Sequence, residues 1–205
     1  MIDLYSGTPG SGKSLHLASY IYFALRRGEP VVSNVQINTS CVKKHCVFNY
    51  IDTFSLDPAA LIDFSRSYWD GNTVKEDKIL LVIDECQLIF NAREWSKAGR
   101  SDWLAFFTQH RKYGYHVILV AQFDHMIDKQ IRSLIEYEYI HRKVSNYGVK
   151  GKFLSLFMGG HVFVSVKVWY PMSEKVSSEF FHARKKFFKL YDTFAVFDEV
   201  KPQPV

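Results

Sequence analysis

The sequence of 205 residues predicts one α/β domain in which helices cover both faces of a mainly parallel sheet. Three apolar runs, residues 1–5, 79–83 and 116–122, support this prediction because they lack the alternation that a strand with one wet face shows. The stretches between them carry apolar residues at helical spacing, so strands and helices are expected to alternate along the chain.

The N-terminal half is expected to contain two helices. A helix is predicted over residues 13–27, with Gly28 just after its end. Asp57 and Pro58 suit an N-cap and a first helical position, so they begin the second helix. The other expected elements are a strand at 30–35, a polar loop at 36–46, a marginal strand at 47–51, the end of the second helix at 70–72 and a charged connection at 73–78.

The C-terminal half is expected to add a β-hairpin to the sheet. After the strand at 79–83, Asp102 suits the N-cap of a helix that Gly114 closes, and Pro171 is expected to end the sheet pattern. Further expected elements are a helix at 124–135, a strand at 137–144, a turn at 146–148, two strands over 153–168 joined at Gly159 and Gly160, and a basic helix at 182–189. The domain organisation predicted is a core at 1–144, an extension at 145–200 and a linker at 201–205.

Residues 7–14, with the letters GTPGSGKS, match the P-loop pattern G-x-x-x-x-G-K-[ST] between a predicted strand and a predicted helix. The glycines let backbone N–H groups turn around a phosphate at a helix N-terminus. Lys13 would reach the β- and γ-phosphates, and the Ser14 hydroxyl would bind Mg²⁺. The predicted fold is therefore that of a P-loop NTPase in three layers. The expected nucleotide-binding residues are Gly7, Thr8, Pro9, Gly10, Ser11, Gly12, Lys13, Ser14 and Leu15.

Polar residues follow the other two buried runs, at the edge where α/β sheets place their ligands. Asp84 would hold Mg²⁺ through its water shell, and Glu85 would take a proton from the attacking water as general base. Gln122 would sense the γ-phosphate or orient water. A glutamate beside Asp84 favours hydrolysis of a nucleoside triphosphate over transfer to an organic acceptor. The simpler alternatives are an acidic turn and a surface glutamine.

Composition restricts the function less than these motifs do. A net charge of +5 suits an anionic partner such as nucleic acid or a membrane surface, or solubility alone. The three cysteines and the lack of a signal peptide favour a reducing, cytoplasmic setting, and no apolar run is long enough for a bilayer span. A metal site at Cys41, His45 and Cys46 is less favoured than reduced cysteines. The basic and aromatic residues of 182–189 suit nucleic acid, lipid headgroups or simply solvent.

The motif set resembles the Zot family: the cytoplasmic domain of zonula occludens toxin-like proteins and the related assembly ATPases of filamentous phages. The resemblance covers nearly the whole chain and groups it with FtsK–HerA-type motor ATPases. The segments that carry it are residues 5–14, 32–34, 82–87, 110–122, 127–132 and 190–193.

The resemblance implies a homo-oligomeric ring in which a neighbouring subunit supplies an arginine to the site. Arg111, Arg93 and Arg132 are the candidates, in that order. It further implies Mg²⁺-dependent ATP hydrolysis that drives phage assembly and export, with phage export proteins and single-stranded DNA as partners. The expected location is the cytoplasmic side of the bacterial inner membrane, through a membrane segment beyond Val205.

The sequence leaves two other functions open. A small-molecule or nucleotide kinase has the same P-loop, although no arginine-rich lid is evident between Asp102 and Arg142. The other alternative is a non-catalytic nucleotide switch or a secreted toxin.

Overall fold

The computed structural model of the chain describes residues 1–42, 46–93, 99–157 and 160–190. Eight strands form one sheet in the order β3-β2-β4-β5-β1-β6-β7-β8. The strands from β3 to β6 run parallel, and β7 and β8 continue the sheet in antiparallel pairing. Their bounds are β1 Ile2–Ser6, β2 Val31–Ser33, β3 Phe48–Tyr50, β4 Ile79–Ile83, β5 Tyr115–Val120, β6 Tyr137–Lys143, β7 Val162–Trp169 and β8 Glu174–His182. The predicted α/β fold with a mainly parallel sheet is confirmed.

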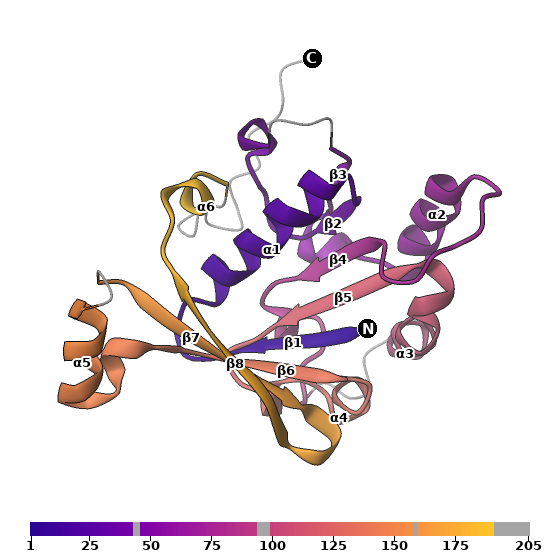
Figure 1. Cartoon of the computed structure of the whole chain (residues 1–205). Coiled ribbons are helices and arrows are strands. Elements are labelled where there is room, and N and C mark those ends of the chain that lie inside the picture. The colour runs from indigo at the N-terminus through magenta and orange to yellow at the C-terminus, as the bar shows by residue number, and fades with distance from the viewer. Residues whose placement is uncertain (43–45, 94–98, 158–159, 191–205) are drawn as a thin grey trace.

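Helices cover both faces of this sheet (Figure 1). Helices α1 and α6 pack together on one face, whereas α2, α3 and α4 lie toward the other. Helix α5 stands apart from the rest, at the ends of β6 and β7. The bounds are α1 Lys13–Arg27, α2 Pro58–Trp69, α3 Arg100–Gln109, α4 Lys129–Arg132, α5 Gly148–Phe157 and α6 Lys185–Leu190.

Two apolar clusters, one on each face, hold the layers together. Every residue of β1, β4 and β5 is buried, as their largely apolar sequences predict. Along β1, Leu4 packs in the cluster beneath α2 and α3, and Tyr5 packs in the cluster beneath α1. Successive side chains of a strand point to opposite faces, so a strand that is buried throughout requires a covering layer on each side.

The N-terminal half follows its prediction closely. Helix α1 has the expected bounds, and Gly28 ends it in the left-handed conformation. Asp57 accepts a hydrogen bond from the Ala60 N–H at 3.4 Å, and Pro58 occupies the first helical position of α2. The amino-acid types at these helix ends fix the conformation locally, which is why the sequence alone places them.

Two helix predictions in the C-terminal half are wrong in detail. Helix α3 begins at Arg100 after Gly99, so Asp102 lies inside its first turn and does not cap it. The helix expected over 124–135 is broken, because Asp128 accepts hydrogen bonds from the N–H groups of Gln130 and Ile131. This cap starts the short helix α4 afresh.

The expected pair of strands over 153–168 is also wrong. Residues 153–157 belong to α5, and the strand β7 begins only at Val162. A short apolar run suits either structure, so its periodicity does not decide between them. The hairpin is instead formed by β7 and β8, and Pro171 lies in the turn between them, where its missing N–H does no harm.

Some predictions fall outside the described residues. His45, one of the three alternative metal ligands, is among these, as are Gly159, residues 191–193 and the linker at 201–205. In the part of the chain that the structure describes, no three His, Cys, Asp or Glu side chains gather as metal ligands would.

Candidate functional site: a phosphate loop and two carboxylates

The glycine-rich loop joins the carboxyl end of β1 to the start of α1. Gly7, Gly10 and Gly12 have φ values of 140°, 73° and 97°, a region that side chains other than glycine rarely adopt. The Gly7 N–H donates to the Gln122 carbonyl at 3.1 Å, and the Ser11 N–H donates to the Thr8 carbonyl at 3.1 Å. The loop is thus anchored to the segment that follows the neighbouring strand β5.

Close packing against the sheet is a second reason for glycine at two of these positions. A Cβ on Gly7 would lie 2.5 Å from the His141 carbonyl oxygen, and one on Gly12 would lie 2.6 Å from the ring of Phe163. These neighbours come from β6 and β7. The glycines therefore allow the loop to sit directly on the sheet, whereas Gly10 faces open space.

Two histidines pack next to the start of the loop. His16 Nδ1 lies 2.8 Å from His141 Nε2, and His141 Nδ1 lies 3.1 Å from the Ser6 carbonyl oxygen. Burial lowers the pKa of His16 to about 4, and burial and the neighbouring His16 lower the pKa of His141 to about 3. Both rings are therefore neutral at pH 7, so this pair adds no charge beside the phosphate loop.

Lys13 is bound to the loop and is influenced by the charges of the acidic residues. Its ammonium donates hydrogen bonds to the Gly7 and Thr8 carbonyls. Burial lowers the pKa of Lys13, while the charges of Glu85 and Asp84 act in the opposite direction. The carboxylates at the end of β4 thus lie close enough to Lys13 to interact with its charge.

A buried asparagine at the end of β2 fixes the position of Asp84. Asn34 accepts a hydrogen bond from the Asp84 N–H at 2.7 Å and donates one to the Asp84 carbonyl at 2.9 Å. It also donates to Thr53 at 2.9 Å. The side chain therefore pairs with both backbone groups of Asp84, in the way that another strand would. Asn34 was not predicted as a site residue, although its polarity just beyond a buried strand is a signal.

Glu85 is held in an uncommon backbone conformation. Its φ is 46°, in the left-handed region where a residue other than glycine is strained. The Glu85 N–H donates to Asp84 Oδ1 at 2.9 Å, and the Gln87 amide donates to the Glu85 carboxylate. Gln87 thus orients the predicted general base, a role that no motif in the sequence indicates.

The start of α1 fits a bound phosphate. No side chain caps its N-terminus, and its first turn contains no acidic residue, so its N–H groups and partial positive charge are left for an anion. The buried Ser11 hydroxyl has no hydrogen-bond partner among the described residues. Ser14 is half-buried in the same first turn, where its hydroxyl suits Mg²⁺, and the Leu15 side chain packs in the core, so Leu15 offers only its backbone.

Comparison with known proteins then identifies the family. The family model for zonular occludens toxin (Zot) matches residues 1–196. The chain belongs to the Zot family. The Gene 1 protein of Enterobacteria phage I2-2 is a relative that is 28% identical over 171 residues, which make up 78% of this chain and 46% of that protein. The Zot-family chain thus spans about half the length of that relative.

Solved structures share its fold. The N-terminal domain of zonular occludens toxin from Neisseria meningitidis superposes with a TM-score of 0.54 at 18% identity, over 93% of this chain and 98% of that one. The genome packaging NTPase B204 from Sulfolobus turreted icosahedral virus 2, solved with ATP-gammaS, gives 0.52 at 15% identity, over 89% and 96% of the two chains. The Zot-family chain therefore has the fold of a P-loop NTPase, and residues 7–14 remain its predicted nucleotide-binding loop. None of the helices described in this chain combines the length and hydrophobicity that a membrane crossing requires.

The order of strands places Gln122 between the loop and the carboxylates. Strand β5 lies between β1 and β4, so the residues after its carboxyl end are flanked by both parts of the site. Gln122 is half-buried there, and its carbonyl holds the loop at Gly7. A hollow of about 450 Å³ opens beside it, lined by Gly7, Thr8, Glu138 and Arg142 among others.

The three candidate arginines lie in different places. Arg111 precedes β5, at the opposite edge of the sheet from the loop, and pairs with Glu136 at 3.2 Å. Arg132 pairs with Asp124 at 3.6 Å. Arg93 is exposed in the segment that follows Glu85. The structure therefore does not bring Arg111 to the phosphate loop of its own chain.

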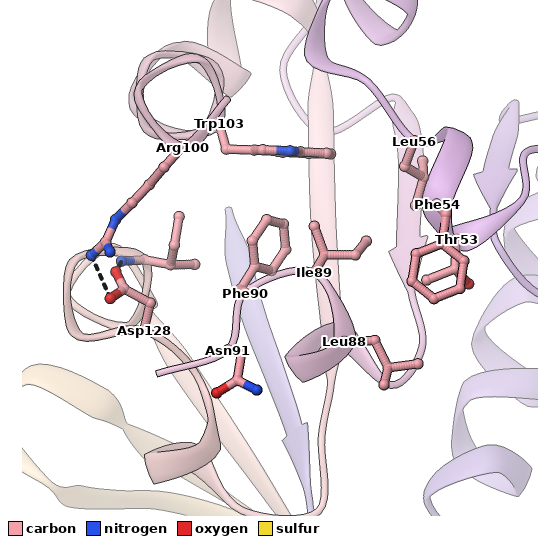
Figure 2. A pocket seen from close by; sticks show the side chains of 11 residues that line it. Thr53, Phe54, Leu56, Leu88, Ile89, Phe90, Asn91, Arg100, Trp103 and Asp128 are labelled. Atoms are coloured by element: carbon pink, nitrogen blue, oxygen red, sulfur yellow. Dashed lines mark hydrogen bonds and ion pairs between the residues drawn. The ribbon is translucent and has the colours of Figure 1, made fainter. Parts of the chain in front are cut away.

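A separate pocket lies in the layer opposite α1. It measures about 230 Å³, and Figure 2 shows Phe90, Ile89 and Trp103 around it. Arg100 and Asp128 form an ion pair at its side. Its lining is mainly apolar and includes no residue of the phosphate loop, so it is distinct from the candidate nucleotide site.

Proposed function

We propose that this Zot-family chain hydrolyses ATP with Mg²⁺ to drive the assembly and export of filamentous phage, including its single-stranded DNA, at the cytoplasmic side of the bacterial inner membrane. The observation that carries the proposal is the strand order, which sets the loop after β1 and the carboxylates of Asp84 and Glu85 after β4 at the same edge of the sheet, beside an uncapped helix N-terminus. The phage Gene 1 relative supports the role in assembly, with phage export proteins as partners, and the likeness to a genome packaging NTPase supports nucleic acid as the cargo.

Each residue has a separate task in this mechanism. The N–H groups of the loop and the Lys13 ammonium hold the phosphates and stabilise the negative charge that develops on them. Ser14 and Asp84 would hold Mg²⁺, which supplies further charge neutralisation when bound. Glu85 accepts the proton of the attacking water, and Gln87 keeps its carboxylate oriented. Gln122 is placed to orient that water or to sense the terminal phosphate.

We further propose that the active form is a ring in which a neighbour completes the site. An arginine supplied by another subunit stabilises charge on the transferring phosphoryl group and contributes about 10³-fold or more to the rate. Arg93 suits this role better than Arg111 or Arg132, because those two are engaged with Glu136 and Asp124 in their own chain. Arg111 remains the alternative if neighbours meet at the opposite edge of the sheet.

The test compares two substitutions in the purified oligomer. Lys13→Ala should weaken binding of a fluorescent ATP analogue and lower phosphate release by about a hundredfold or more. Glu85→Gln should still bind the analogue and lower phosphate release by about 10²- to 10⁴-fold. The exposed Lys112→Ala is the matched control and should leave both unchanged.

Two outcomes contradict the proposal. Phosphate release by Lys13→Ala at the rate of the natural sequence would mean that the site is elsewhere. Stoichiometric formation of a phosphorylated acceptor in place of free phosphate would identify a kinase.

A further inference from the structure

Helix α5 turns its apolar side outward. In most surface helices of soluble proteins the apolar side faces the core. Here, at about 100° per residue, the exposed apolar positions fall within an arc of roughly 100°. They are Val149, Phe153, Leu156 and Phe157, with exposed fractions of 72%, 71%, 76% and 93%.

Packing on the opposite side of α5 fixes this orientation. Gly151 is buried so tightly that a Cβ there would lie 2.3 Å from the Val144 carbonyl oxygen. The buried Ser155 donates a hydrogen bond from its hydroxyl to the Gly160 carbonyl at 2.7 Å. The helix is therefore held to the domain by its small and polar side, and its apolar side is left for another partner.

The charge around α5 is entirely positive along the sequence. Lys150 and Lys152 are exposed and border the apolar arc on its two sides. No Asp or Glu occurs between Glu138 and Glu174. An apolar face bordered by lysines, with no acidic residue nearby in the chain, is complementary to a bilayer that contains anionic lipids.

We propose that α5 docks on the surface of an anionic lipid bilayer, with its apolar arc in the boundary between headgroups and acyl chains. The helix lies in the plane of the membrane and does not cross it. This inference rests on the membrane location proposed above and deepens it, but it requires no ATP hydrolysis. It places the carboxyl end of β6, which adjoins the phosphate loop, next to the membrane.

Other occupants explain the surface less well. The apolar pocket of Figure 2 on a second copy would accept one ring but not four side chains, and the charges at its side are already paired as Arg100 and Asp128. A nucleic acid would satisfy the lysines and leave Val149 and Leu156 in water. A lipid surface satisfies both parts of the pattern.

The test is flotation of the purified chain with two kinds of vesicle, one of phosphatidylcholine alone and one that also contains phosphatidylglycerol. The chain should float with the anionic vesicles, and less so as salt is raised. Lys150→Gln with Lys152→Gln should weaken this binding roughly thirtyfold, and Phe153→Gln with Phe157→Gln should weaken it by at least about tenfold. Phe54→Gln is the matched control, because Phe54 is 79% exposed elsewhere, and it should bind like the natural sequence.

Several outcomes overturn the inference. Undiminished flotation of the phenylalanine pair would show that α5 is not the contact. If the natural sequence does not bind vesicles and the phenylalanine pair sediments as smaller assemblies than the natural sequence, the occupant is a second copy. If the natural sequence does not bind vesicles and the lysine pair loses binding to single-stranded DNA, the occupant is nucleic acid. Circular dichroism checks that each variant is folded.

The ATPase assay separates this inference from the proposed function. Lys13→Ala should float like the natural sequence, and the α5 variants should release phosphate at the natural rate in the absence of vesicles. Failure of hydrolysis with normal flotation would refute only the function, and the reverse result would refute only the role of α5.

Discussion

The glycines of the phosphate loop differ in what surrounds them, and this difference can be measured. Gly10 and Gly12 both have positive φ, so alanine at either position should cost roughly 1–2 kcal/mol of backbone strain. Only at Gly12 would the new Cβ also collide with the ring of Phe163. Gly12→Ala should therefore lower the free energy of unfolding by about 1–3 kcal/mol more than Gly10→Ala, as measured by urea denaturation.

A double-mutant cycle isolates the collision. Phe163→Ala removes the ring atoms that the Cβ would meet, so part of the cost of Gly12→Ala should disappear in the double variant. Equal costs for Gly10→Ala and Gly12→Ala, with no coupling to Phe163, would show that the loop does not sit on β7 as described.

At this scale the sequence predicts residues whose role depends on local spacing. Lys13 and Ser14 follow from the P-loop pattern, and Asp84 and Glu85 follow from a buried strand that ends in carboxylates. Asn34 could not be assigned in the same way, because its partners Asp84 and Thr53 are distant in the chain. The strand pairing of β2 with β4 is what brings them together.

The pairing of strands β2 and β4 continues beyond its last backbone pair, because the Asn34 side chain hydrogen-bonds to Asp84. Asn34→Ala should remove two hydrogen bonds to buried backbone groups of Asp84 and lower the free energy of unfolding by about 2 kcal/mol or more. It should also lower kcat more than nucleotide affinity, because it displaces the carboxylates and leaves the loop intact. Urea denaturation and steady-state phosphate release check the two effects.

Two variants serve as controls for this connection. Thr53→Val removes one partner of Asn34 and keeps both bonds to Asp84, so it should retain most of the activity. The exposed Asn72→Ala should change stability by less than about 0.5 kcal/mol. An unchanged kcat in a folded Asn34→Ala variant would mean that the position of Asp84 does not depend on this side chain.

Element boundaries were predictable where end signals are local and wrong where packing decides. Asp57 with Pro58, and Gly28, mark helix ends by their own chemistry. The apolar run at 153–157 carries no such signal, and the attachment of α5 through Gly151 and Ser155 turns the apolar side of this helix outward. The fold was therefore more predictable than the surface that supports the membrane inference.

For the whole molecule, the strand order sets where a second subunit of the proposed ring would act. The carboxyl ends of β1, β5 and β4 lie side by side and carry the loop, Gln122 and the two carboxylates. Arg111 and Arg132 are engaged within their own chain, and Arg93 lies exposed after the carboxylates. In the proposed ring, a completed site should thus combine the loop of one subunit with Arg93 of its neighbour, and we expect activity only in the assembly.

Mixing two inactive variants tests this arrangement. Lys13→Ala has a defective loop and an intact Arg93, whereas Arg93→Ala has an intact loop and a defective arginine. If the two assemble randomly in equal amounts, about one quarter of the interfaces pair an intact loop with an intact arginine, so about one quarter of the natural phosphate release should return. Equal mixtures of Lys13→Ala with Arg111→Ala or Arg132→Ala are the matched comparisons. If the mixture containing Arg93→Ala releases no more phosphate than its separate components, Arg93 is not the arginine supplied between subunits. If Arg111→Ala is inactive alone and its mixture with Lys13→Ala recovers activity, the contact lies at the opposite edge of the sheet.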